Sequence, residues 1–243
     1  MSSEKKVNVA IAGASGAVGE ALIDILQGRK FPVGELALLA SERSAGKRLQ
    51  FNGKSVQIQR LDEFDFSNTQ IGLFSAGGSV SAEFAPKAAA QGCIVVDNTS
   101  HFRNDDDIPL VVSEVNPECV ADYAPRNIIA NPNCSTAQLV VALKPVHDAF
   151  GVRRVVVSTY QATSGAGKDG MDELFNQTRG IYVNDPVRPE NFTKQIAFNA
   201  IPHIDVFMDD GFTKEEWKMT AETKKFLDPA IELVAQCVRI PVF

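Results

Sequence analysis

Short apolar runs, dense in β-branched residues, recur up to residue 130 and predict buried strands. Between them, residues 17–27 and 82–91 place small and apolar side chains at helical spacing. Asn52 and Gly53, between two further strand-like segments, indicate a tight hairpin. Strands that alternate with helices form βαβ units, so we expect an α/β protein with a mainly parallel sheet. The predicted strands lie at residues 7–12, 36–40, 71–75, 93–97 and 127–130.

The pattern changes after residue 133. A helix is predicted over residues 135–149, then an apolar strand over 152–160, and then long loops punctuated by glycine and proline. Thr213 and Glu216 have the spacing of a capping box, so a further helix should begin there. A last apolar strand is expected at residues 239–242. We therefore place a boundary between two domains, 1–133 and 134–243.

Composition and charge restrict the classes of partner. The chain has 243 residues, of which 44% are hydrophobic and 22% charged, as is usual for globular proteins. A net charge of -6 argues against nucleic acid and anionic membranes as partners. No apolar run approaches the roughly 20 residues that span a bilayer, and the first residues lack a signal-peptide pattern. Four scattered cysteines lack the paired spacing of a metal site, so we expect a reduced, cytoplasmic protein without a metal.

A glycine cluster lies between the first predicted strand and the first predicted helix. Gly13, Gly16 and Gly19 follow the spacing G-x-x-G-x-x-G, which departs from the commoner G-x-G-x-x-G. Glycines there permit a tight turn and let backbone N–H groups approach a pyrophosphate at the helix N-terminus. Glycine turns join strands to helices in many folds, but this position is the one that a dinucleotide site requires. The expected cofactor contacts are Gly13, Ser15, Gly16, Ala17 and Val18.

The end of the second predicted strand bears on the choice between NADP and NAD. Ser41, Arg43 and Ser44 could hold a 2′-phosphate, which favours NADP. Glu42 could instead bind the ribose hydroxyls of NAD. Arg43 could also be no more than a solvated loop arginine.

Cys134 is the candidate nucleophile. It falls in the first turn of a predicted helix, where the helix dipole and unpaired N–H groups favour thiolate over thiol. A thiolate is what a nucleophilic cysteine requires. The alternative is a small buried residue, which is how most free cysteines behave.

Four segments together resemble the aspartate-semialdehyde dehydrogenase family: GASGAVGE, DNTSHFR, NPNCST and YQATSGAGK. The similarity runs from the amino terminus to the last residue. It implies a Rossmann-type domain, a mixed α+β catalytic and dimerisation domain, and a homodimer. Enzymes of this family use NADPH to reduce β-aspartyl phosphate, and they release phosphate and aspartate β-semialdehyde for lysine, threonine and methionine biosynthesis. The resemblance implies that Cys134 forms a thioester, which then accepts hydride.

The resemblance also implies roles for further residues. Asn133 and Gln161 would position substrate at the thiolate, and Ser164 and Gly165 would approach the nicotinamide. Arg103, Glu222 and Lys225 would bind substrate, with Arg103 and Lys225 near phosphate and Glu222 at the α-amino group. Without the resemblance, Gln161 is a polar strand end and Arg103 a surface arginine beside an acidic run. Glu222 and Lys225 then belong to a solvated, salt-bridged helix face, and we expect only structural roles for Glu215 and Lys218 on that face.

The family's acid/base histidine and its carboxylate-binding arginine are expected beyond Phe243, so we expect a truncated chain. His101, His147 and His203 match no catalytic position. Two alternatives remain open. One is N-acetyl-γ-glutamyl-phosphate reductase, which shares the thioester chemistry, and the other is a non-catalytic fragment that binds NADP.

Overall fold

The computed structural model describes residues 5–243. The chain falls into two compact units, of which the first ends at Asn133 and the second runs from Cys134 to Phe243. Each unit is described by itself.

The first unit is built on a seven-stranded sheet in the order β3-β4-β2-β1-β5-β6-β7. Every pairing is parallel except that of β3 with β4. The chain moves outward from β1 in both directions, so the strand order reverses beside β1, which is where α/β proteins bind ligands. The five strands predicted for this region are confirmed. The strands are β1 Val7–Ala12, β2 Val33–Ala40, β3 Arg48–Phe51, β4 Lys54–Arg60, β5 Ile71–Phe74, β6 Ile94–Asp97 and β7 Ile128–Ala130.

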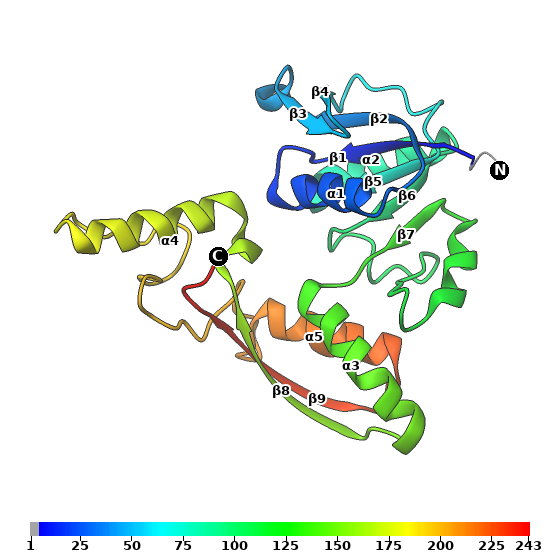
Figure 1. The fold of residues 1–243 in the computed structure, drawn as a ribbon. Helices are drawn as coiled ribbons and strands as arrows, with labels where there is room; N and C mark the ends of the chain where they lie inside the picture. The colour runs from blue at the N-terminus through cyan, green and yellow to red at the C-terminus, as the bar shows by residue number, and fades with distance from the viewer. Residues whose placement is uncertain (1–4) are drawn as a thin grey trace. The chain divides into compact units, whose positions relative to one another are not determined.

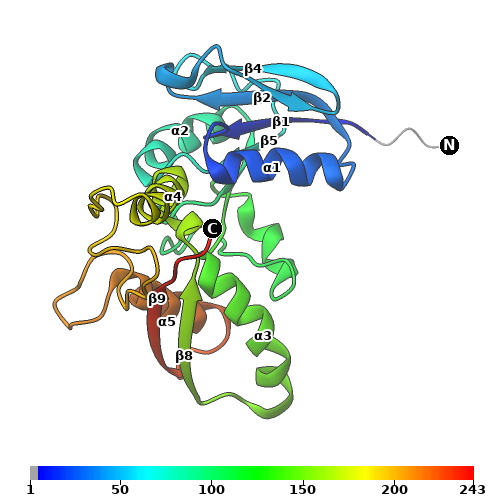
Figure 2. The ribbon, with the colours of Figure 1, turned by 60° about the vertical axis from the view of Figure 1, so that its left-hand side comes forward.

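Helices cover this sheet on both faces. The main ones are α1 (Ala17–Gly28) and α2 (Gly78–Ala90), and the right-handed crossovers on either side of β1 place them on opposite faces (Figure 2). Ile23 of α1 packs on a core that contains Ile11 and Leu38. Each such buried aliphatic side chain stabilises the fold by about 1.5–3 kcal/mol. Two short 3₁₀ helices, η1 (Glu42–Ser44) and η2 (Pro117–Tyr123), lie in the connections.

The predicted hairpin is confirmed at Asn52 and Gly53. Both residues have positive φ, 48° and 75°, as a two-residue type I′ turn requires. The turn pairs Phe51 with Lys54 and so sets the register of β3 against β4.

The second unit contains two long parallel strands, β8 (Arg154–Gln161) and β9 (Glu232–Arg239). Helices α3 (Cys134–Phe150) and α5 (Lys214–Phe226) lie side by side over one face of this pair (Figure 1). Between the helices and the strands lies an apolar core centred on Met219 of α5. The alternating pattern of the strands turns Val156, Tyr160 and Val234 to the opposite face, where they are exposed.

Two predictions for this unit are wrong. The segment after β8 is not all loop, because η3 (Thr163–Ala166) leads into α4 (Gly167–Tyr182). The buried positions of α4 are Gly170, Glu173, Leu174, Gln177 and Gly180. Apolar residues nevertheless recur along this helix at helical spacing, so the sequence held a signal that the loop prediction missed.

The last strand also ends earlier than predicted, at Arg239. Pro241 has no N–H to donate to a ladder, which stops the strand. The chain beyond it instead accepts hydrogen bonds at Val242 O from the backbone N–H and hydroxyl of Thr163, at 2.8 and 2.9 Å. Within residues 5–243, no helix combines the length and apolarity needed to cross a bilayer.

Candidate active site

The glycine turn after β1 has room only for glycine at two positions. Gly13 has a φ of 90°, and a Cβ there would lie 2.7 Å from Ser75 O. A Cβ on Gly19 would overlap Gly13 O and the backbone of Ala14. The first glycine therefore permits the turn, and the third permits close packing of α1 against it, as in dinucleotide sites.

The start of α1 is open to an anion. Gly16 is the N-cap, and its N–H donates to Gly13 O at 3.0 Å, but no side chain caps the helix. Gly16 and Val18 are exposed, and Ser15 and Ala17 are half-buried. The N–H groups of the first turn carry the positive end of the helix dipole, which attracts phosphate.

Residues at the end of β2 reach the same edge of the sheet, since β1 and β2 are neighbours and parallel. Ser41 and Arg43 are exposed, whereas Ser44 is buried. The Glu42 carboxylate lies 3.7 Å from the guanidinium of Arg60, the last residue of β4. Glu42, the acidic residue that favours NAD, therefore already has the cation of Arg60 beside it.

Arg103 is held at the carboxyl edge of the first sheet. Only 7% of it is exposed, so its interpretation as a surface arginine is wrong. Its Nε donates to Asn131 O at 2.9 Å and its Nη2 to Asn98 O at 3.1 Å. Asn98 and Asn131 follow β6 and β7, so two strand ends fix this guanidinium.

Cys134 is the first residue of α3 and is exposed. It is therefore not the small buried residue of the alternative interpretation. Cys93 and Cys237 do fit that description, since burial raises the pKa of their thiols to about 12 and about 11. Asn133 directly precedes Cys134 and is 8% exposed.

Gln161 and Arg239 end the two strands of the second unit and are register partners. The amide nitrogen of Gln161 donates to Thr159 Oγ1 at 3.1 Å and to Glu215 Oε1 at 3.5 Å. Arg239 is 6% exposed, and its Nη1 donates to Ala162 O at 2.6 Å.

Burial lowers the pKa of Arg239, and the negative charges of Glu215, Cys134 and Cys237 act in the opposite direction. A buried guanidinium thus lies within electrostatic reach of the candidate nucleophile. The sequence argument had treated Arg239 only as part of a strand. Its place at the polar end of an apolar strand was the signal in the sequence that could have identified it.

The remaining predicted residues are placed as follows. Glu222 on α5 is 4% exposed, so the idea of a fully solvated helix face is wrong for it, whereas Lys225 is exposed. Ser164 and Gly165 lie in the exposed η3 turn. A Cβ on Gly165 would lie 2.8 Å from Arg239 Nη1, so this turn touches the same guanidinium.

The described chain thus gathers two groups of predicted residues, one in each unit. The glycine turn and the end of β2 share one sheet edge in the first unit. In the second unit, Arg239 is the register partner of Gln161, and its guanidinium lies against Gly165. Cys134 lies within electrostatic reach of Arg239.

A Rossmann-type sheet with a glycine turn, followed by a second, mixed unit, is the architecture of a nicotinamide-dependent dehydrogenase. Comparison with known families agrees. Residues 8–123 match the semialdehyde dehydrogenase NAD-binding domain, and residues 143–243 match the semialdehyde dehydrogenase dimerisation domain.

Relatives specify the family further. Aspartate-semialdehyde dehydrogenase 2 of Vibrio cholerae is 60% identical over 240 residues, which cover 98% of this chain and 71% of the relative. The enzyme of Aquifex aeolicus is 56% identical over 238 residues, which cover 97% of this chain and 70% of the relative. The crystal structure of aspartate semialdehyde dehydrogenase II from Vibrio cholerae complexed with ASA superposes with a TM-score of 0.97 at 58% identity, covering 99% of this chain and 72% of that one. The chain belongs to the aspartate-semialdehyde dehydrogenase family, and the resemblance seen in its motifs is confirmed.

Proposed function

We propose that this protein interconverts β-aspartyl phosphate and aspartate β-semialdehyde with NADP as cofactor. The observation that carries the proposal is an exposed Cys134 at a helix start, within electrostatic reach of the buried cation Arg239. A thiolate there attacks the acyl phosphate, the C–O bond to phosphate breaks, and a thioester forms on Cys134. A bound nicotinamide supplies the hydride that releases the aldehyde and returns the thiolate.

We assign the substrate's carboxylate to Arg239. A guanidinium donates parallel hydrogen bonds that match a carboxylate, and burial leaves its attraction for that carboxylate less screened by water. The resemblance had suggested that this arginine lies beyond Phe243, but Arg239 has the required charge, burial and place beside Gln161.

Other predicted residues keep their proposed roles. Arg103 binds the phosphoryl group, for which two strand ends orient its guanidinium. Glu222 binds the α-amino group, and Lys225 attracts phosphate. Asn133 and Gln161 position the acyl group, and Asn133 donates to the oxyanion that forms during attack.

We propose NADP rather than NAD. The first glycine turn fits the pyrophosphate of either cofactor, because its glycines leave the start of α1 uncapped and accessible. Exposed Ser41 and Arg43 can meet a 2′-phosphate, and Glu42 is already beside Arg60. A related enzyme from Candida albicans, 26% identical with a TM-score of 0.74, was crystallised with NADP, and the match covers 98% of this chain and 69% of that one.

We also propose that the protein acts as a homodimer. The dimerisation-domain match covers residues 143–243 of the second unit, and one face of its β8–β9 pair exposes Val156, Tyr160 and Val234. An apolar sheet face of this kind is commonly covered by another subunit.

The experiment is a phosphate-dependent assay of NADPH formation from aspartate semialdehyde, with N-acetyl-glutamate semialdehyde as the competing substrate. We expect turnover of the first and little of the second. The Cys134→Ser variant should lose turnover while its NADP affinity stays within about twofold, because a serine hydroxyl is not ionised at neutral pH. Cys119→Ser is the control. Preference for the acetylated substrate, or NADP binding without turnover, would contradict the proposal.

A further inference from the structure

Glu215 is a buried carboxylate that the proposed reaction does not use. It is the second residue of α5 and is 6% exposed. Its Oε1 lies 3.5 Å from Gln161 Nε2, and its Oε2 lies 3.4 Å from Lys218 Nζ. Glu215 therefore contacts both Gln161, a predicted site residue, and Lys218, on its own helix.

We propose that Glu215 is a positioning residue, which fixes the orientation of the Gln161 amide at the end of β8. The inference rests on the proposed function for the meaning of its kinetic readout. Its alkylation readout does not depend on the identity of the substrate.

The argument for Gln161 concerns which end of its amide faces the substrate. The amide nitrogen is directed at Thr159 Oγ1, 3.1 Å away, and at the Glu215 carboxylate. A carboxylate only accepts hydrogen bonds, so it selects the orientation in which nitrogen faces α5. The amide oxygen then faces away from Glu215, where it can accept from an N–H or ammonium group of the substrate. Without the carboxylate the amide has two comparable orientations.

Glu215 is itself held in place. Lys218 Nζ lies 2.6 Å from Asp205 Oδ2, and the other carboxylate oxygen of Asp205 accepts from the N–H of Val206 at 2.9 Å. Asp205 has a φ of 69°, which is uncommon for a residue with a side chain. The contacts Asp205–Lys218–Glu215–Gln161 thus connect a constrained loop to the site through the first turn of α5.

The test uses the isosteric variant Glu215→Gln. Its new amide can donate to the Gln161 oxygen, which permits the reversed orientation. We expect kcat/KM for aspartate semialdehyde to fall about 10- to 100-fold, as for loss of a hydrogen bond to a charged group, with little change in the thermal midpoint. Glu232→Gln, an exposed position at the start of β9, is the matched control and should leave kcat/KM unchanged.

A double-mutant cycle separates positioning from a general structural role. If Glu215 acts through Gln161, then Glu215→Gln loses most of its effect in a Gln161→Ala background. An equal loss in both backgrounds would overturn the proposed coupling. Glu215→Asp keeps the charge and should recover part of the activity. If Glu215→Gln does not fold, this variant tests in its place whether Glu215 acts through Gln161.

The second readout is alkylation of Cys134 by iodoacetamide without substrate, followed by mass spectrometry. Glu215→Gln should leave the rate within about twofold of the parent protein, because the substitution changes the Gln161 amide and not the thiol. A large change in the rate would overturn the inference, since the loss of turnover would then come from a disturbed thiol site. A parent protein that is alkylated at Cys134 but turns over no aspartate semialdehyde would instead count against the proposed function alone.

Discussion

At the residue scale, small differences in available space decide what the site can hold. Gly165 has nothing beyond its Cα, so the Arg239 guanidinium comes within 2.8 Å of where a Cβ would be. Gly13 and Gly19 create the corresponding space around the turn after β1. The close approaches at Gly165 and Gly13 join residues far apart in the sequence, whereas the one at Gly19 lies within the turn. Each glycine is therefore best tested by its own substitution.

Gly165→Ala should displace the Arg239 guanidinium from Ala162 O. Because a contact of 2.8 Å is too short for a Cβ, the side chain must move, and we expect kcat/KM for aspartate semialdehyde to fall about tenfold or more. The measurement is steady-state kinetics. Gly28→Ala, where a Cβ meets nothing within 4 Å, is the matched control. Equal kinetics for the two variants would show that Arg239 does not need this space.

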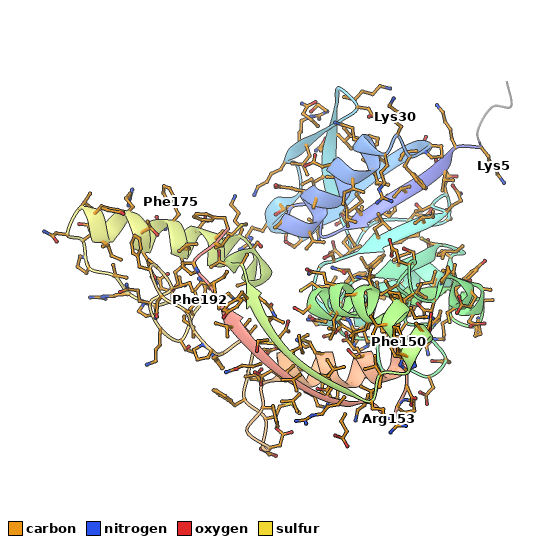
Figure 3. All side chains as sticks on the ribbon, turned by 60° about the horizontal axis from the view of Figure 1, so that its bottom comes forward. Lys5, Lys30, Phe150, Arg153, Phe175 and Phe192 are labelled. Carbon is orange, nitrogen blue, oxygen red and sulfur yellow. The ribbon has the colours of Figure 1, made fainter. Side chains whose placement is uncertain are left out.

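Arg43→Ala tests the proposed cofactor preference. Loss of a charge-assisted contact to the 2′-phosphate should weaken NADP binding by about tenfold and leave NAD binding nearly unchanged. Isothermal titration with both cofactors measures this. Arg153→Ala, an exposed arginine of the second unit that Figure 3 labels, controls for loss of charge. Parallel weakening of both cofactors would remove Arg43 from the 2′-phosphate site.

At the element scale, α5 organises the second unit through its first turns. Thr213 and Glu216 form a full capping box, which confirms the prediction from sequence. The Glu216 carboxylate also accepts from the N–H of Cys237 at 3.1 Å, and so it ties the start of α5 to β9. A capping signal is local and therefore visible in the sequence. The tie to β9 joins residues 21 apart and is not.

The ion pair between Asp205 and Lys218 should make this element sensitive to acid. Burial raises the pKa of Asp205, but hydrogen bonds from Lys218 and Val206 outweigh it, and the net pKa is lowered from 3.8. The folded form therefore binds the Asp205 proton less readily than the unfolded form, so this stabilisation is complete above pH 3.8 and fades as the pH falls through the lowered pKa.

Asp205→Asn should accordingly lower the thermal midpoint at pH 7 by about 2–4 °C. The difference from the parent protein should shrink as the pH falls below 3.8. Thermal scans across this range provide the measurement. Asp148→Asn, which breaks the exposed pair with Lys144 on α3, should have little effect at any pH. A pH-independent difference would assign the loss to packing rather than charge.

At the scale of the whole molecule, the chain forms two units with separate cores and different architectures. The first is a parallel sheet covered by helices on both faces. In the second, helices α3 and α5 cover one face of the β8–β9 pair and leave the other face uncovered (Figure 1). Along both strands, buried and exposed side chains therefore alternate between the two faces. This uncovered face is where we expect self-association.

Val156→Asp should weaken the dimer, because Val156 is 70% exposed on that face and a carboxylate there would be buried without a partner. We expect the mass in solution to fall from twice 26.3 kDa towards the monomer value. Size-exclusion chromatography with light scattering measures it. Val146→Asp, an exposed valine on α3, is the control. A parent protein that is already monomeric would contradict the homodimer.

The sequence by itself determined the local features: the strands of the first unit, the glycine turn, the hairpin at Asn52, and the capping box of α5. Each depends on neighbouring residues and on periodicity, and the four matched segments added the family. The structure revealed α4, for which apolar residues at helical spacing had been a usable signal, and it showed the early end of β9. It alone brought Arg239 and Glu215 to Gln161, because they come from β9 and α5, far along the chain. Burial and opposing charge, which give these two residues their chemistry, exist only after the chain has folded.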